Sequence, residues 1–428
     1  MSADIKLIKG RRVWDSRGRP TVEAEVHLSD GAVGRSIAPA GASTGSAEAV
    51  DRRDGGDAFG GLDVIGAVNS VSNEIAEKLR GRDAFDQADI DQTMIKLDGT
   101  SDRSRLGGNA LVATSMAVAH AAAVSAKLPL WKFLGGNLEI YKMPLPEVQI
   151  FGGGAHAGRR VDIQDFMVIA VGADCYEQSL EWTAEVYQRA GKIMSNAGRL
   201  RGVADEGGFW PDFSSNEEAL DFLVRAIEGA GFTPGDEIAI SLDIAATDFG
   251  RGGQYKLAAD NRVVDADGLS EILLTWLDKY PVVSIEDPLG EDDADALAKF
   301  TVAAGPKVEV VADDFICTSA DKIKKAKLIG ACNTALIKPN QAGTLTEAKA
   351  ALDAAHLAGW ESIVSARSGE SEDVTIVHLA VGWGVKQLKV GSFSRSERMA
   401  KWNEGLRVAE VIGSGGGNLH LRSSFPWK

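Results

Sequence analysis

Cysteine, histidine and positive charge are all scarce in this sequence. Three cysteines among 428 residues lie far apart without a Cys-x-x-Cys spacing, and only six histidines are present. The cysteine pattern disfavours a redox or disulfide role and is typical of small buried residues in a reducing cytosol. Acidic residues outnumber basic ones by 61 to 46, which gives a net charge of −15. We therefore expect neither nucleic acid nor an anionic membrane as the main partner.

Long apolar runs are also missing. No eighteen consecutive apolar residues occur, and the first residues lack the apolar segment of a signal peptide. We therefore expect no membrane span and a cytoplasmic protein. Hydrophobic residues make up 44% and charged residues 25% of the chain, as in ordinary soluble proteins. A chain of this length predicts two domains, or one large barrel with an attachment.

Residues 1–140 carry the pattern of a small α+β domain. Residues 21–40 alternate apolar and polar side chains around a Ser-Asp-Gly turn, which predicts an antiparallel hairpin. Residues 63–81 and 107–135 then show helical periodicity. The second stretch is almost entirely apolar, so we expect that helix to be buried.

Residues 141–428 change to short apolar runs, most of them followed by a helical stretch. The runs end in polar residues spaced 43, 27, 25, 27 and 24 residues apart, namely Asp243, Glu286, Asp313, Lys338, Ser365 and Lys389. About 25 residues accommodate one strand, one helix and their loops, so this region is interpreted as βα units with parallel strands. A doubly wound open sheet is the alternative. A TIM-like βα-barrel is favoured because polar residues gather at the same end of many consecutive strands. The glycine-rich stretch 413–418 follows no strand and is expected to be a turn.

Three of these strand ends carry carboxylates. Asp243, Glu286 and Asp313 end consecutive runs, and neighbouring strands of a barrel lie about 4.8 Å apart. Converging carboxylates repel one another, and a hard dication bound by oxygen ligands relieves that repulsion. The pattern predicts Mg²⁺. For any single aspartate, a helix cap or an ion pair is an equally good interpretation.

Two lysines end later strands. Lys338 and Lys389 would lie beside the metal, where burial and nearby cations lower the basicity of a lysine and suit it to act as a base. For one of the two, a plain ion pair is the alternative. Glu206 lies in the glycine-rich segment "DEGGF", whose flexible backbone could aim its carboxylate into a site.

Further candidates lie in loops and at one strand end. Arg367 and Ser368 offer a forked donor and a hydroxyl, which suit a phosphate or a carboxylate. His156 lies in the loop "GGGAHAG" and is a candidate substrate contact. Ser43, in the small-residue loop "APAGASTGSAEA", belongs either to a mobile lid or to an ordinary turn.

The chain resembles the enolase family over essentially its whole length. The stretches that carry the resemblance occur in the family's order: "WDSRGRPTVE", "APAGASTGSAEA", "LDGTSDRSRLGGNAL", "GGGAHAG", "DEGGF", "SLDIAATDF", "SIEDP", "VADDF", "LIKPNQAG", "SARSGESED" and "RSERMAKWN". The resemblance implies an N-terminal α+β domain that caps a C-terminal βα-barrel. It also implies a homodimer or a higher homo-oligomer.

The resemblance assigns roles residue by residue. Asp243, Glu286 and Asp313 resemble the ligands of a tight Mg²⁺ site, and Ser43 resembles the residue that helps to hold a second Mg²⁺ arriving with substrate. Lys338 resembles the base that removes the proton next to the substrate carboxylate. The other implied roles are the acid that assists departure of the 3-hydroxyl, the carboxylate-binding lysine, the phosphate contacts and the loop histidine (Glu206, Lys389, Arg367 with Ser368, and His156).

The chain departs from the family at two positions near the implied site. Enolases read Ser-His-Arg-Ser-Gly-Glu where this chain has Ala366 in place of the histidine. They read Gln-Glu-Phe where this chain has Asp165, one methylene shorter than the family's catalytic-site glutamate. Both changes fall on the side where hydroxide leaves.

Three hypotheses follow. The first is a specialised enzyme that acts on 2-phosphoglycerate or a phosphonate relative, such as the enolase-like carboxyphosphonoenolpyruvate synthases of phosphonate biosynthesis. The second is a housekeeping enolase with tolerated substitutions. The third, an inactive scaffold, is disfavoured because such a protein needs neither the three carboxylates nor the two lysines.

Overall fold

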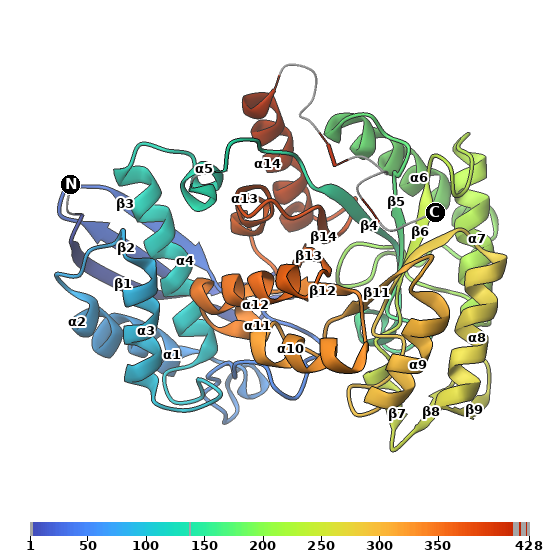
Figure 1. Cartoon of the computed structure of the whole chain (residues 1–428), viewed down its shortest axis with the longest axis horizontal. Coiled ribbons are helices and arrows are strands. Elements are labelled where there is room, and N and C mark those ends of the chain that lie inside the picture. Colours follow the sequence, from blue (N-terminus) through green and yellow to red (C-terminus); the bar gives the residue numbers. More distant parts are fainter. Residues whose placement is uncertain (1–2, 137, 414–418, 421–424, 426–428) are drawn as a thin grey trace.

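A computed structural model describes residues 3–136, 138–413, 419, 420 and 425. Its first part is a three-stranded antiparallel sheet packed against helices (Figure 1). The strands are β1 (Ile5–Trp14), β2 (Pro20–Leu28) and β3 (Val33–Ile37). The helical elements are η1 (Ala58–Gly61), α1 (Ile65–Ser70), η2 (Val71–Ile75), α2 (Ala76–Leu79), α3 (Gln87–Asp98), α4 (Gly108–Ser125) and α5 (Leu130–Gly135).

The central helix of this part is α4. The predicted hairpin is confirmed as β2 and β3, and α4 lies against both strands. Almost every residue of α4 is buried, as its apolar composition predicts. Gly34 of β3 permits the close approach, because a Cβ at that position would lie 2.1 Å from the backbone nitrogen of Ala121. The predicted domain division at residue 140 falls between α5 and the next strand.

The second part contains a closed eight-stranded barrel with its own apolar core. Around the barrel the strands are β10 (Val282–Glu286), β11 (Glu309–Ala312), β12 (Thr334–Ile337), β13 (Glu361–Ser365), β14 (Gln387–Ser392), β4 (Leu145–Gly152), β5 (Asp165–Ile169) and β6 (Ala239–Asp243). The predicted barrel is therefore confirmed, and the open sheet is excluded. The carboxyl ends of β6 and of β10 to β14 meet at one rim.

Helices follow the barrel strands (Figure 1). They are α6 (Tyr176–Asn196), α7 (Asn216–Gly229), α8 (Ala266–Lys279), α9 (Ala294–Ala304), α10 (Ala320–Ile329), α11 (Pro339–Ala342), α12 (Leu345–Leu357), α13 (Thr375–Gly382) and α14 (Ser396–Ile412). In the described part of the chain, none of the helices combines the length and apolar character needed to cross a bilayer. The expected turn at 413–418 lies outside the described residues except for its first residue.

The expectation of parallel strands throughout is wrong at β5, which pairs antiparallel with both β4 and β6. Only residues 153–164 connect β4 to β5, and a parallel crossover needs a longer connection with a helix. The wide spacing before Glu286 also has a cause, because a small antiparallel sheet precedes α8. That sheet consists of β7 (Gly250–Arg251), β8 (Gln254–Leu257) and β9 (Arg262–Asp265).

Candidate active site

The predicted metal carboxylates lie on neighbouring strands at one rim of the barrel. Asp243 and Glu286 end β6 and β10 and are directly paired across those strands. Asp313 follows the last residue of β11. All three side chains are buried, with exposed fractions of 2% to 6%. Because these carboxylates are buried away from bulk water, each must find a partner inside the protein.

Two ammonium groups neutralise much of this charge. Lys389 Nζ lies 2.8 Å from Asp243 Oδ2 and 2.7 Å from Glu286 Oε2, and 3.6 Å from Asp165 Oδ2. Lys338, immediately after β12, donates to Asp313 Oδ2. The sequence therefore placed the lysines and the carboxylates in one cluster correctly.

The expected low basicity of the lysines is not observed. Burial opposes the charged form of Lys389, but the carboxylate of Asp243 and its neighbours outweigh it and raise its pKa well above the usual value. The pKa of Lys338 is likewise raised, because the charge of Asp313 outweighs burial. The expectation took the metal ion as the charge nearest to each lysine. In the structure, carboxylates are the nearest charges, and they raise the pKa of each ammonium group.

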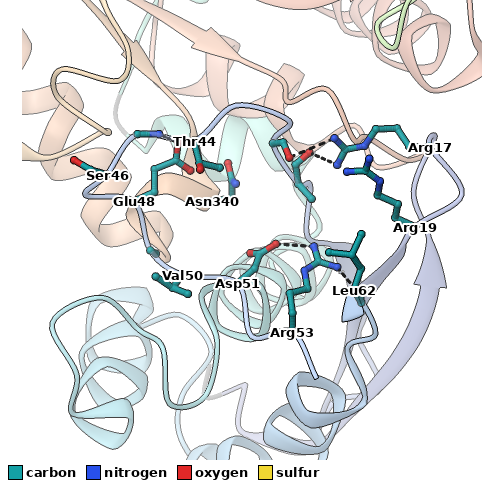
Figure 2. Close-up of a pocket in the computed structure, with 14 residues that line it drawn as sticks. Arg17, Arg19, Thr44, Ser46, Glu48, Val50, Asp51, Arg53, Leu62 and Asn340 are labelled. Carbon is teal, nitrogen blue, oxygen red and sulfur yellow. Dashed lines mark hydrogen bonds and ion pairs between the residues drawn. The ribbon is translucent and has the colours of Figure 1, made fainter. Parts of the chain in front are cut away.

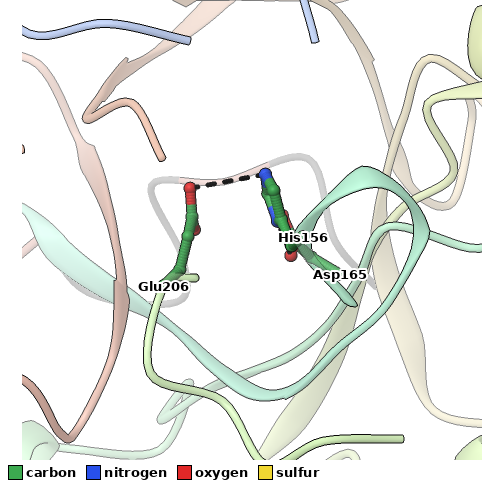
Figure 3. A group of neighbouring side chains, drawn as sticks. All are labelled: His156, Asp165 and Glu206. Carbon is green, nitrogen blue, oxygen red and sulfur yellow. Dashed lines mark hydrogen bonds and ion pairs between the residues drawn. The ribbon is translucent and has the colours of Figure 1, made fainter. Parts of the chain in front are cut away.

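A second cluster joins His156, Asp165 and Glu206 (Figure 3). His156 lies in η3 (Gly154–Ala157), Asp165 begins β5, and Glu206 lies in the loop before α7. His156 Nδ1 is 3.1 Å from Asp165 Oδ1, and its Nε2 is 3.8 Å from Glu206 Oε1. Gly207 has a φ of +94°, which lets the chain turn sharply after Glu206.

The imidazole of this cluster is held in its charged form. Burial opposes the charge of His156, but the carboxylates of Glu206 and Asp165 outweigh it and raise the pKa of His156 to about 9. The reciprocal effect lowers the pKa of Asp165, although burial alone would raise it. At neutral pH the cluster therefore pairs a charged His156 with the carboxylate of Asp165.

This shift predicts a pH-dependent stability. Because the pKa of His156 is raised to about 9 in the folded protein, its contribution is complete below about pH 6.5 and disappears as the pH rises through about 9, a loss of up to about 3 kcal/mol. We expect the free energy of unfolding to fall across that window in urea titrations, and His156→Gln to flatten the fall. An equal slope in the variant would contradict the assignment.

The predicted phosphate contact, Arg367, is engaged by the loop that carries Ser43. Arg367 NH1 donates to Glu48 Oε2 at 2.8 Å, and NH2 donates to the backbone oxygen of Ser43 at 2.9 Å. Ser43 Oγ also lies 3.3 Å from Gln164 Oε1. The small-residue loop therefore lies directly over the cluster, which favours the lid interpretation over that of a surface turn. Ser368 is buried beside Arg367.

Comparison with known proteins agrees with this architecture. Residues 5–134 match the family described as "Enolase, N-terminal domain", and residues 140–420 match "Enolase, C-terminal TIM barrel domain". "Enolase 2" of Pseudomonas syringae pv. syringae (strain B728a) is 45% identical over 416 residues, 97% of each chain. "Enolase 2" of P. syringae pv. tomato (strain ATCC BAA-871 / DC3000) is 44% identical over the same length and share.

The chain belongs to the enolase family. Membership makes it a lyase-family enzyme. The substrate of this enolase-family protein depends on the geometry of its own side chains, Ala366 and Asp165 among them.

Magnesium, which this family implies, fits the residues present. Glu286 Oε1 is buried and accepts no hydrogen bond from any described residue. Burial, and then the like charge of Asp243, raise the pKa of Glu286 well above its usual value despite Lys389 beside it, so a further positive charge would stabilise its ionised form. The donors available are carboxylate oxygens, which a hard dication prefers.

Asp287 has a different role, because its two oxygens accept hydrogen bonds from the backbone N–H groups of Asp313 and Asp314 at 2.9 and 2.8 Å.

Several supporting residues of this enolase-family site were missed from the sequence. Glu48 anchors Arg367, Gln164 donates to Asp243 at 3.0 Å, and Gln341 donates to Asp313 at 2.8 Å. Glu48 and Gln341 lie within quoted motifs, and Gln164 directly precedes Asp165, so proximity to a motif was the available signal. Amides and carboxylates in loops carry no pattern that separates such roles from ordinary surface positions.

Ala366, one of the departures from the family, lies between the end of β13 and Arg367. Ala366 is 6% exposed, and its backbone nitrogen donates to the Lys389 carbonyl at 2.8 Å. This hydrogen bond to β14 fixes the backbone between β13 and Arg367. Its methyl side chain offers no hydrogen bond, so the polar groups at this end of the site are those of the neighbouring clusters.

Proposed function

We propose that this protein is a Mg²⁺-dependent enolase-type enzyme that removes the proton α to a carboxylate. Its proposed substrate is 2-phosphoglycerate or a close phosphonate analogue, and its product is of the phosphoenolpyruvate type. The observation that carries the proposal is the presence of two ionisable clusters at one rim, joined by the contact between Lys389 and Asp165 at 3.6 Å. Lys338 belongs to the carboxylate cluster, whereas Glu206 belongs to the histidine cluster.

The two clusters suit opposite halves of a β-elimination. Lys338 Nζ would accept the α-proton, and Glu206 would deliver a proton to the departing hydroxyl. Mg²⁺ held by Asp243, Glu286 and Asp313 would neutralise the charges that raise the pKa of Lys338 and stabilise negative charge developing on the substrate carboxylate. His156, which is charged at neutral pH, would offset the repulsion between the side chains of Glu206 and Asp165.

The remaining residues suit recognition of the substrate's two anionic groups. Lys389 would bind the carboxylate, and Arg367 with Ser368 would bind the phosphoryl group. To bind the phosphoryl group, the Arg367 guanidinium would have to release a hydrogen bond to Glu48 and form one with the substrate instead. Ser43 would approach a second Mg²⁺ as the loop closes.

We further propose that the enzyme is specialised. Ala366 and Asp165 shorten side chains on the half of the site where the β-substituent leaves, while the residues for the α-proton and the metal are retained. A smaller, less polar leaving-group half favours a substrate with a different β-substituent or a phosphonate. The enolase-like carboxyphosphonoenolpyruvate synthases are one example of such a specialised group.

Restoring the family residues should reveal the specialisation. We expect the wild type to turn over 2-phosphoglycerate well below about 10–10³ s⁻¹, and Ala366→His with Asp165→Glu to be faster. The added imidazole supplies a donor towards departing hydroxide, while filling a packed position costs about 1–3 kcal/mol of stability. Steady-state kinetics with 2-phosphoglycerate and with a phosphonate analogue measure both effects.

The matched control is Ala366→Leu, which adds volume without a donor. It should weaken activity on the phosphonate analogue and bring no gain on 2-phosphoglycerate. Vigorous wild-type turnover of 2-phosphoglycerate would instead support a housekeeping enolase, and no turnover of any α-proton substrate would support a scaffold.

A further inference from the structure

A cavity of about 390 Å³ lies on the outer side of the loop that carries Ser43 (Figure 2). Its walls come from the β1–β2 turn, from the loop itself, from the segment 49–62 that follows the loop, and from Asn340 of the barrel part. The volume is within the range of about 300–1,000 Å³ that small-molecule sites occupy. None of the residues proposed above for acid–base chemistry lines it.

Three arginines face this cavity, namely Arg17, Arg19 and Arg53. Figure 2 shows Arg17 and Arg19 alongside each other at one end and Arg53 beside Asp51. Arg53 has its own carboxylate, since it donates to Asp51 Oδ2 at 2.8 Å, and it also donates to the backbone oxygens of Pro20 and Leu62. The other lining carboxylate, Glu48, is bound to Arg367.

The Arg17–Arg19 end is therefore short of negative charge. The Arg17 side chain is only 6% exposed, and its one carboxylate partner is Asp15, at 3.3 Å. Burial lowers the pKa of Arg17, and the like charge of Arg19 adds to this against the attraction of Asp15. Among the described residues, none forms a hydrogen bond or ion pair with the Arg19 side chain. Asp15 is thus the one carboxylate that forms an ion pair with either guanidinium among the described residues, and Asp205 adds a smaller attraction to Arg17.

We propose that this cavity binds a small phosphate-bearing anion between Arg17 and Arg19. Guanidinium forks match the oxygens of a phosphate group. The Arg17 side chain is 6% exposed, and Arg19 is exposed beside it. The rest of the cavity leaves room for a compact organic group. This site is separate from the proposed phosphate contact at Arg367 and does not depend on the proposed reaction.

The cavity is coupled to the lid through Arg17 and Gly41. Arg17 NH2 donates to the Ala40 backbone oxygen at 2.9 Å, and its NH1 donates to that of Gly41 at 3.3 Å. On the inner side, a Cβ at Gly41 would lie 1.9 Å from Arg367 NH2. One thickness of backbone therefore separates the cavity from the site. An anion that fixes Arg17 should hold residues 40–48 in place.

Inorganic phosphate is the probe, with chloride used to keep ionic strength constant. We expect phosphate to raise the melting temperature of the full-length protein and to slow amide hydrogen exchange in residues 40–48. In Arg19→Gln the apparent affinity should be at least about tenfold weaker, the loss of one charge-assisted hydrogen bond. The control is Arg251→Gln, the same charge change at an exposed position of β7, which should respond like the wild type.

Two outcomes would overturn the proposal. If Arg19→Gln keeps the wild-type response, phosphate acts elsewhere, including at Arg367. If malonate protects residues 40–48 as well as phosphate does, the site recognises carboxylates and the phosphate assignment is wrong. Melting of Arg19→Gln without phosphate checks that the variant folds.

Discussion

Lys338→Ala abolishes the exchange of the substrate's α-proton with deuterated solvent. Lys338 is the proposed general base, and its ammonium group donates a hydrogen bond to Asp313. Loss of a general base typically costs about 10²–10⁴-fold in rate. Proton NMR of 2-phosphoglycerate in D₂O, with Mg²⁺ present, measures the exchange directly. It reports the first bond broken and does not require that the wild type eliminate hydroxide quickly.

Glu206→Gln is the matched control for this experiment. Glu206 lies in the other cluster, against His156, so its amide should leave α-proton exchange in place and block elimination. The two variants therefore separate the two halves of the reaction. Wild-type exchange in Lys338→Ala would place the base elsewhere, and loss of exchange in both variants would mean that the clusters act as one unit.

Asp313→Ala should weaken Mg²⁺ binding by more than about 100-fold. Loss of an outer partner typically costs 10–100-fold, and removal of a direct ligand costs more. The change also leaves Lys338 without its carboxylate, so an uncompensated ammonium remains where the dication has to bind. Titration calorimetry with Mg²⁺ gives the affinity, and far-UV circular dichroism checks the fold.

Two further variants test which carboxylates form the site. Asp243→Asn should lose affinity as Asp313→Ala does, because both carboxylates are assigned to the same ion. Asp314→Asn should bind Mg²⁺ within a few-fold of the wild type, although Asp287, Asp313 and Asp314 also have ligand atoms within 4.8 Å of one another. A larger loss in Asp314→Asn than in Asp243→Asn would move the ion into that second group.

The barrel and its reactive rim were predictable because they follow from repeated local patterns. Apolar runs about 25 residues apart that end in Asp313, Lys338 or Lys389 specify strands whose ends meet at one rim. The direction of β5 did not follow, because its apolar run looks like those of its parallel neighbours. Only the short connection after β4 distinguishes it.

Side-chain partners were less accessible from the sequence than backbone positions. The raised pKa of Lys389 depends on Asp165, Asp243 and Glu286, which come from three other strands. Glu48 meets Arg367 across 319 residues of chain, a contact that no local pattern specifies. Such contacts depend on tertiary packing and rotamers, which no spacing along the chain encodes.

The most direct measurement is wild-type protein with Mg²⁺ and 2-phosphoglycerate in D₂O, followed by NMR for both α-deuteration and phosphoenolpyruvate. We predict that α-deuteration is faster than formation of phosphoenolpyruvate. Lys338 and the proposed metal-binding carboxylates are in place, whereas Ala366 and Asp165 give less assistance to the departing hydroxide. Absence of α-deuteration, or phosphoenolpyruvate formed at the roughly 10–10³ s⁻¹ of ordinary metabolic enzymes, would contradict a specialised enzyme that keeps enolase-type proton abstraction.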